Sequence, residues 1–264
     1  MKAAHFLMDE SPKKKTLRQL DLMGFLEKSG YASVEELTTR FSVTSQTIRR
    51  DIADLAMQGR VRRHHGGVAL TSPIDAQTYR QRRVERFTIK HRIARRVAEL
   101  VPDGASVFLD AGSTCEAVAE ALCERKELKI VTYSLRAAVI LTDRTDFTIA
   151  VPGGFVKNVA GSVMGESMSE FIRRFRFDTA IIAVSGIDED GAMGDDDQNE
   201  VSIVRTAIGQ ARSTLLATDS SKFYRTALVH LGNVTEVDDL VTDAKPEGAL
   251  QHTLAASQVN LHIA

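Results

Sequence analysis

The stretch from Ser42 to Val68, SVTSQTIRRDIADLAMQGRVRRHHGGV, constrains the fold more than any other part of the chain. Ile48, Ile52 and Leu55 recur there at the period of an α-helix, which predicts a helix that packs this apolar face inward. The basic run that follows ends in a pair of glycines, a combination that favours a tight hairpin. We therefore expect a short helix followed by a basic hairpin.

The outward faces of this helix and hairpin carry side chains suited to DNA. Guanidinium, amide and hydroxyl groups read base edges in the major groove and bind phosphates. Thr44 or Ser45 can cap the helix, so that its positive dipole end faces the phosphates. The candidate DNA contacts are Ser45, Gln46, Thr47, Arg49 and Arg50 on the helix and Arg60, Arg62, Arg63, His65 and Gly66 on the hairpin. A solvated charged face is the simpler alternative for the arginines.

Two more helices are expected ahead of this stretch. Apolar residues between Thr16 and Lys28 recur at helical spacing, and Ser33 with Glu36 forms a capping box before a second amphipathic segment. Three helices followed by a hairpin constitute a winged helix-turn-helix. Residues 79–100 read as a further long helix, which we interpret as a solvated connector. A contact to the DNA backbone or to another subunit through its arginines is the alternative.

The charge of the 264 residues is divided unevenly along the chain. Residues 1–92 contain 18 Lys+Arg against 10 Asp+Glu, a net charge of +8, and the remainder contains 16 against 25, a net charge of −9. A basic N-terminal third suits a polyanionic partner, whereas the acidic remainder argues against nucleic acid over the whole surface. We expect a flexible N-terminus (1–15), a winged helix-turn-helix domain (16–70), a linker with a connecting helix (71–100) and an effector-sensing domain (101–264).

Short apolar runs alternate with helical segments in the C-terminal part. The expected strands include residues 107–109, 130–131, 147–151, 180–184, 215–217 and 259–263, and the expected helices 117–122, 135–141, 167–175 and 201–211. Continuous apolar strands that alternate with helices predict a largely parallel sheet covered on both faces. The expected fold class is α/β, with an N-terminal winged helix-turn-helix and a C-terminal, mostly parallel α/β domain.

No apolar run approaches the roughly 20 residues that span a bilayer, and the N-terminus MKAAHFLMDESPKKK has no apolar signal segment. We therefore expect a cytoplasmic protein without a membrane partner. Cys115 and Cys123 are the only cysteines. On one helix they would lie about 12 Å apart, too far for a disulfide, so we expect them to be packing residues. No cofactor and no metal are expected.

Ligands of parallel sheets bind at the carboxyl ends of the strands, so the residues that follow each strand indicate a binding site. The loop from Asp110 to Thr114 leads into a helix with a glycine, two hydroxyls and free N–H groups, which predicts a phosphate cradle. A simple capping turn made by Ser113 and Glu116 is the alternative. Further candidate effector contacts after the other strands are Ser134, Gly154, Gly186, Glu200 and Lys222. The acidic run 188–197 is interpreted as a solvated lid rather than a metal loop.

TIRRDI followed by RRHHGGV resembles the signature of the DeoR family of bacterial transcriptional regulators. LDAGST, the PGG turn, SGID with its acidic loop, and DSSKF are similar to the effector domain of that family, which resembles the sugar-phosphate isomerase fold. The resemblance thus covers essentially the whole chain. Within the family, VTSQTIRRDI, SGIDEDG and DSSKFYRTALVHLG resemble the glycerol-3-phosphate regulon repressor subgroup.

The resemblance implies a repressor of a sugar or polyol catabolic operon that a phosphorylated sugar or polyol releases from double-stranded operator DNA. It implies a phosphate held by Gly112, Ser113 and Thr114 with help from Lys222. It also implies polyol contacts from Asp110, Ser134, Gly154, Gly186 and Glu200. The chain departs from the family at Tyr133, where Asn is usual, and at Tyr224, where Gly is usual. Both departures bear on the inducer rather than on its phosphate.

The alternative from another class is a sugar-phosphate isomerase, in which Asp110 or Glu200 acts as the base and Lys222 as an electrostatic partner. An isomerase has no need of a DNA-binding third, so we expect a regulator without enzymatic activity. A homodimer or homotetramer is expected, because paired recognition helices reach half-sites about 34 Å apart, or a multiple of that spacing.

Overall fold

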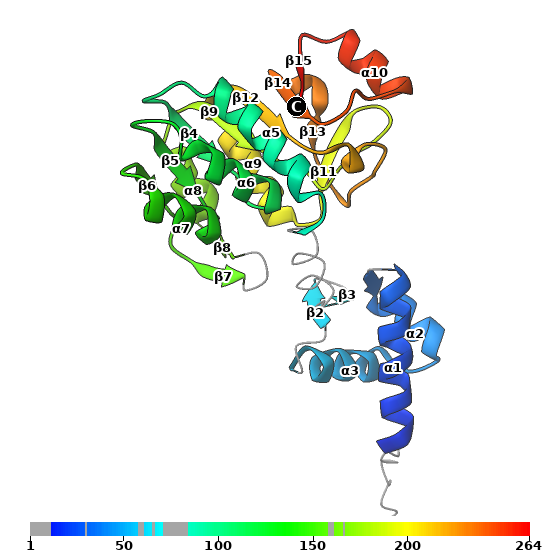
Figure 1. Cartoon of the computed structure of the whole chain (residues 1–264). Helices are drawn as coiled ribbons and strands as arrows, with labels where there is room; N and C mark the ends of the chain where they lie inside the picture. The colour runs from blue at the N-terminus through cyan, green and yellow to red at the C-terminus, as the bar shows by residue number, and fades with distance from the viewer. Residues whose placement is uncertain are drawn as a thin grey trace, which may run out of the picture. The chain divides into compact units, whose positions relative to one another are not determined.

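The structure is a computed structural model that describes residues 12–29, 31–57, 61–64, 67–70, 84–157, 161–165 and 167–264. Internal contacts divide the chain into two units, Met1–Thr78 and Tyr79–Ala264. Figure 1 traces both units along the chain. Among the described residues, no helix combines the length and the apolar character needed to cross a membrane.

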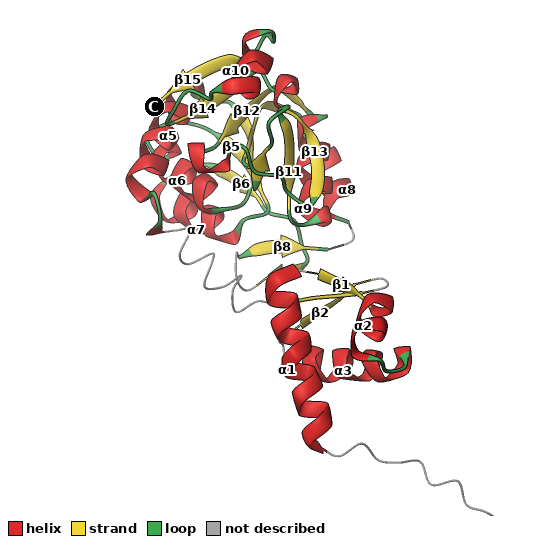
Figure 2. Cartoon of the chain, turned by 90° about the vertical axis from the view of Figure 1, so that its right-hand side faces the viewer, coloured by secondary structure: helices red, strands yellow, loops and turns green. Residues whose placement is uncertain are grey.

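The N-terminal unit is a winged helix. Helices α1 (Pro12–Ser29), α2 (Val34–Phe41) and α3 (Ser45–Met57) accompany a three-stranded antiparallel sheet in the order β1 (Tyr31–Ser33), β3 (Gly67–Leu70) and β2 (Val61–His64) (Figure 2). The apolar stripe predicted for α3 is buried, with Ile48, Ile52 and Leu55 packed in one core with Leu22 and Leu37. The turn between β2 and β3, at residues 65–66, lies outside the described residues.

Hydrogen bonds at the helix starts explain where α2 and α3 begin. The Ser33 hydroxyl accepts a hydrogen bond from the Glu36 N–H at 3.0 Å, and the Thr44 hydroxyl accepts one from the Thr47 N–H at 3.2 Å. Each bond satisfies a backbone donor that the helix itself leaves open. The predicted capping positions of both helices are therefore confirmed.

The C-terminal unit is built on a seven-stranded, entirely parallel sheet. Its order is β15 (Asn260–Ile263), β14 (Asp239–Thr242), β12 (Ala211–Ala217), β9 (Phe177–Ile182), β4 (Ser106–Leu109), β5 (Lys129–Thr132) and β6 (Thr148–Ala150). The predicted parallel sheet is confirmed. β14 was not among the predicted strands.

Helices cover both faces of this sheet, as predicted (Figure 1). The helices on one face are α5 (Phe87–Leu100), α6 (Ser113–Leu122) and α7 (Leu135–Arg144), and those on the other are α8 (Met168–Arg173), α9 (Gln198–Ile208) and α10 (Gly248–Ala255). Successive strand residues point to opposite faces, so Val107 and Leu109 pack on the first face while Phe108 packs on the second.

Smaller elements lie beside the main sheet. A second, antiparallel sheet joins β10 (Gly186–Ile187), β11 (Ala192–Asp195) and β13 (Val229–Asn233), and a separate hairpin joins β7 (Phe155–Lys157) to β8 (Ser162–Met164). The 3-10 turns are η1 (Ser220–Lys222) and η2 (Val234–Glu236).

The acidic run 188–197 includes the turn between β10 and β11 of the second sheet. The Asp188 carboxylate accepts a hydrogen bond from the Ala192 N–H at 2.8 Å and thereby closes the turn between β10 and β11. The predicted solvent exposure is confirmed for Glu189, Asp190 and Asp196, and the role of this hairpin as a lid stays a prediction.

Helix α5 differs from the predicted solvated connector. Its residues Ile93, Ala94, Val97 and Ala98 are buried in the core beneath the sheet. The helix begins at Phe87 because Arg86 has a φ of 54°, a left-handed conformation that a right-handed helix cannot continue. Of the predicted span, residues 79–83 lie outside the described residues.

Candidate functional site

Helix α3 presents the predicted polar set on its surface. Ser45, Gln46, Arg49 and Arg50 are exposed, and Thr47 is half-buried because its hydroxyl contacts that of Thr44 at 3.0 Å. Both guanidiniums of TIRRDI are accessible, while the apolar side of the same helix is buried. The helix therefore has the two-sided character that a major-groove reader needs.

A buried ion pair anchors the inner side of α3. The Arg18 Nε atom lies 2.5 Å from Asp51 Oδ2, and Gln19 Nε2 donates to Asp51 Oδ1 at 3.4 Å. Asp51 was not among the predicted functional residues, although the sequence carries a signal for it. Asp51 falls three residues after Ile48 and four before Leu55, so a carboxylate interrupts an apolar stripe and requires a buried partner.

The described part of the wing is its backbone. Arg62 pairs with Ala69 and Arg63 with Val68 across β2 and β3. The side chains of Arg62 and Arg63, and all of Arg60, His65 and Gly66, lie outside the described residues. Their contacts to DNA stay predictions.

Asp110, at the carboxyl end of β4, accepts three hydrogen bonds from protein donors. Its Oδ1 atom accepts hydrogen bonds from the Tyr133 hydroxyl at 2.5 Å and the Ala111 N–H at 2.7 Å, and Oδ2 accepts one from the Ala183 N–H at 3.0 Å. Burial raises the pKa of this carboxyl from 3.8 to about 6. Asp110 thus joins the exits of β4, β5 and β9, and Tyr133 is its partner.

The neighbouring loop is shaped to receive an anion. Gly112 has a φ of 112°, which L side chains rarely adopt, and a Cβ added there would meet nothing within 4 Å. Helix α6 begins at Ser113 with Gly112 as the N-cap, and no side chain caps it. The alternative interpretation, a capping turn made by Ser113 and Glu116, is therefore wrong. The positive end of α6 remains available to an anion.

A pocket of about 490 Å³ lies between the starts of α5 and α6. Ser113 and Glu116 line it on one side, and Phe87 and Lys90 line it on the other. Lys90 was not among the predicted site residues because it falls in a segment that reads as an amphipathic helix. Its side chain is largely buried, and its Nζ donates to the Glu85 carbonyl at 3.1 Å.

Glu200 lies in a second polar cluster, at the start of α9. Lys157 Nζ, from β7, lies 3.4 Å from Glu200 Oε1 and 3.1 Å from Asp197 Oδ2. Burial raises the pKa of Glu200 from 4.5 to about 7, against the lowering effect of Lys157. Lys157 was not among the predicted site residues, because nothing in the local sequence of this hairpin indicates a partner on α9.

The other predicted effector contacts have mixed surroundings. Ser134 is buried, and its hydroxyl caps α7 by accepting a hydrogen bond from the Ala137 N–H at 3.2 Å. Protein fills the space beside two further candidate contacts, Gly154 and Gly186, since an added Cβ would overlap a backbone carbonyl in each case. Chain packing therefore accounts for these two glycines. Lys222 is half-buried in η1, and Thr114 is buried in the first turn of α6.

Cys115 is buried and Cys123 half-buried, and both are free thiols, as predicted. Burial raises the pKa of both thiols.

The N-terminal winged helix exposes a helix rich in hydrogen-bond donors, and the C-terminal parallel α/β unit has a strand edge that suits an anion. Together these features define a two-domain, DNA-binding transcriptional regulator with a sensor domain. Residues 18–73 match the model of the DeoR-like helix-turn-helix domain, and residues 85–244 match that of the DeoR C terminal sensor domain. The chain belongs to the DeoR family.

Curated relatives cover nearly all of the chain. The glycerol-3-phosphate regulon repressor of Escherichia coli K12 is 40% identical over 250 residues, which are 95% of this chain and 99% of that protein. The HTH-type transcriptional repressor CsqR of the same organism is 38% identical over 92% of this chain and 94% of its own length. Both are named repressors, so the chain is a transcriptional regulator and not an enzyme.

Among solved structures, ribose 5-phosphate isomerase A from Methanocaldococcus jannaschii aligns with a TM-score of 0.40 and 14% identity. The alignment covers 53% of this chain and 55% of that chain.

Proposed function

We propose that this protein is a cytoplasmic repressor of a sugar or polyol catabolic operon, released from its operator by a phosphorylated polyol of the glycerol-3-phosphate type. The observation that carries the proposal is the two-sided helix α3, with Arg49 and Arg50 exposed and Ile48 and Asp51 buried. Gln46 and Arg49 read bases, while the wing residues Arg60, Arg62, Arg63 and His65 contact phosphates and supply salt-dependent affinity.

The effector phosphate binds at the carboxyl edge of the sheet, between Gly112, Ser113 and Thr114 on one side and Lys222 on the other. β4 and β12 are separated by one strand, β9, so their exit loops lie about 10 Å apart. That separation suits a lysine side chain reaching a phosphate at the α6 N-terminus. Asp110, Ser134 and Glu200 complete the proposed contacts, and Gly154 and Gly186 are left out because protein backbone fills the space beside them.

Asp110 has both carboxylate oxygens already engaged by protein donors. A carboxylate oxygen has two lone-pair sites, so Asp110 Oδ2 can accept one more hydrogen bond from a ligand hydroxyl. Glu200 Oε1 accepts a hydrogen bond from the Lys157 ammonium at 3.4 Å, and a ligand hydroxyl can share this carboxylate.

A symmetric homodimer or homotetramer presents two α3 helices to half-sites on one face of the duplex. The test begins with selection of bound duplexes from a random pool by the full-length protein. A selected pair of related half-sites, bound with an affinity that falls steeply with salt, supports the proposal. Binding without sequence preference contradicts it.

The effector is tested by thermal unfolding in the presence of phosphorylated sugars and polyols, with glycerol-3-phosphate first. A ligand that binds the folded protein raises the melting temperature. The same compound should then weaken binding to the selected duplex. No stabilisation by any phosphorylated compound would contradict the proposed sensor site.

A further inference from the structure

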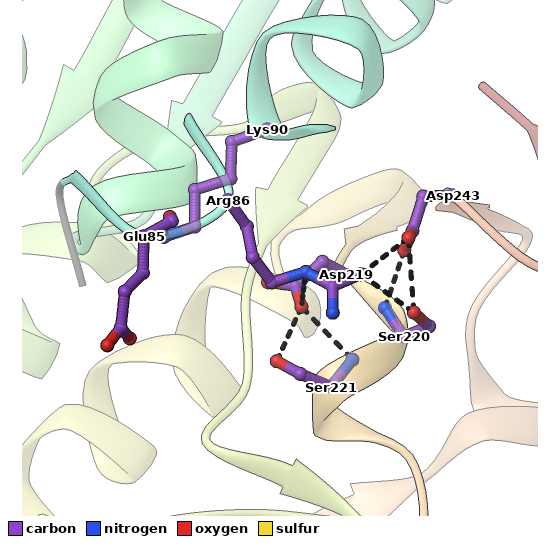
Figure 3. A network of polar contacts seen from close by, with 7 residues as sticks. All are labelled: Glu85, Arg86, Lys90, Asp219, Ser220, Ser221 and Asp243. Carbon is purple, nitrogen blue, oxygen red and sulfur yellow. Dashed lines mark hydrogen bonds and ion pairs between the residues drawn. The ribbon is translucent and has the colours of Figure 1, made fainter. Parts of the chain in front are cut away.

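The side chain of Arg86 joins the start of α5 to two strand exits. Its Nε atom lies 3.0 Å from Asp219 Oδ1, and its Nη2 atom lies 2.6 Å from Asp243 Oδ2 and donates to the Ser220 hydroxyl at 2.9 Å (Figure 3). Asp219 follows β12 and Asp243 follows β14, which are neighbouring parallel strands. Arg86 therefore ties the first turn of α5 to the carboxyl edge of the sheet.

The same two carboxylates hold the turn that carries Lys222. Asp219 Oδ1 accepts hydrogen bonds from the N–H and the hydroxyl of Ser221, at 3.0 and 2.5 Å. Asp243 accepts hydrogen bonds from the N–H and the hydroxyl of Ser220, at 2.6 and 3.1 Å. A shift of this turn would therefore act on both partners of Arg86.

The first turn of α5 also faces the α6 N-terminus, the part of the proposed phosphate site that lies across from Lys222. Phe87 and Lys90 line the pocket of about 490 Å³ that Ser113 also lines. The start of α5 thus contacts the α6 N-terminus through the pocket and the Lys222 turn through Arg86. An effector bound between Ser113 and Lys222 is therefore next to the first turn of α5 at two places, the pocket and the Lys222 turn.

The backbone at this point depends on these contacts. Arg86 has a φ of 54°, a conformation that costs free energy in a residue other than glycine. The chain passes through residues 84–86 on its way from the DNA-binding unit to the sheet of the sensor unit. Arg86 is held here by its side-chain ion pairs and by the hydrogen bond that its carbonyl accepts from the Lys90 N–H at 2.9 Å.

We propose that Arg86 is a positioning residue that transmits effector binding at the Asp219–Lys222 turn to the chain segment leading to the DNA-binding unit. The inference rests on the proposed function. A phosphate at Lys222 adds negative charge beside Asp219 and Asp243, the two carboxylates that share the Arg86 guanidinium. The Arg86 contacts therefore differ in energy between the empty and the occupied sensor, and coupling between sites requires such a difference.

The test uses the full-length chain with Arg86→Gln and Arg86→Lys. The matched control is Arg96→Gln, because Arg96 lies on the same helix and pairs with Glu99 and His262 instead. Three quantities are measured: affinity for the selected duplex, affinity for glycerol-3-phosphate, and the ratio of duplex affinities without and with saturating glycerol-3-phosphate. The third quantity measures transmission, which a purely structural role would not change selectively.

Arg86→Gln is expected to keep the first two quantities within about threefold and to lower the third at least about fivefold, the lower end of typical allosteric coupling. Arg86→Lys keeps the charge but not the planar fork, so it restores part of the ratio. Arg96→Gln should match the wild type. Asp243→Asn, which weakens the same pair from the other side, carries the test if Arg86→Gln does not fold.

If Arg86→Gln has the wild-type ratio of duplex affinities, the inference about Arg86 is overturned and the proposed function stands. A parallel loss of all three quantities also overturns the inference, because it assigns Arg86 to general stability. A wild-type protein whose duplex affinity no phosphorylated polyol changes overturns the proposed function, and the inference with it.

Discussion

The guanidinium of Arg18 donates a hydrogen bond to the carboxylate of Asp51 with 2.5 Å between Nε and Oδ2, and the two side chains are 9% and 1% exposed. This pair joins α1 to the buried face of α3. An unpaired charge at such a site is strongly unfavourable. The pair therefore helps to hold α3 in one orientation on the rest of its unit.

Removing the carboxylate should destabilise the N-terminal unit. Asp51→Ala leaves the Arg18 charge buried without this partner, which costs about 3–5 kcal/mol in comparable pairs. Hydrogen exchange of the α3 amides should accelerate accordingly, because it reports the stability of this unit separately. Asp54→Ala is the matched control, since Asp54 pairs with Lys15 at the surface. If the α3 amides are equally protected against hydrogen exchange in both variants, Asp51 does not stabilise the N-terminal unit in this way.

Base reading is tested at Arg49. Arg49→Ala should cost about 1–3 kcal/mol on the selected duplex and relax the base preference at one position of each half-site. Selection from a random pool, repeated with the variant, shows which position is affected. Equal losses on selected and random duplexes would instead indicate a phosphate contact.

The wing should act on phosphates. Arg63→Ala is expected to weaken all duplexes alike and to reduce the slope of log affinity against log salt by about 1. Binding titrations at several salt concentrations measure the slope directly. An unchanged slope would take Arg63 off the list of phosphate contacts.

Effector binding should depend on Lys222. Lys222→Ala removes the ammonium proposed to hold the phosphate, so thermal stabilisation by glycerol-3-phosphate is lost while duplex affinity is kept. Lys245→Ala, an exposed lysine in the same unit, serves as the control and should respond normally. A normal response in Lys222→Ala would misplace the pocket.

The buried carboxyl of Glu200 should make the stability of the sensor unit depend on pH. Its pKa is raised from 4.5 to about 7, so the folded state binds more protons than the unfolded state between these values. Stability therefore falls as pH rises through this range, by roughly 3 kcal/mol at most. Glu200→Gln should flatten the dependence of the melting temperature on pH between about 6 and 8, while the raised pKa of Asp110 keeps part of the slope below about 6. The exposed Glu189→Gln control should not, and a wild-type slope in Glu200→Gln would contradict the assignment.

The helices and strands followed from the sequence where local patterns decide them. Ile48, Ile52 and Leu55 gave the inner face of α3 by their spacing alone, and Ser33 and Thr44 marked helix starts because a cap lies within three residues of the N–H that it satisfies. The parallel sheet followed from apolar runs that alternate with helices.

The candidate effector site was only partly predictable, because its contacts join residues that are far apart in the sequence. Asp110 is recognisable after a strand, but its bond to Tyr133 depends on β4 lying beside β5. The Lys157 contact with Glu200 spans 43 residues and has no local signal. In the sequence, Gly154 and Gly186 suggest space for a ligand after a strand, and only the structure shows that backbone carbonyls occupy that space.

The sequence by itself therefore determined the class of protein, a winged helix with a basic surface followed by an α/β domain, because periodicity, caps and charge act within a few turns of chain. Only the tertiary structure decided that Arg86 leaves the helix and binds Asp219 and Asp243. Those partners lie more than a hundred residues away and come within reach only because strand order places the exits of β12 and β14 side by side. Ion pairs of this kind depend on distance in space, which local sequence does not encode.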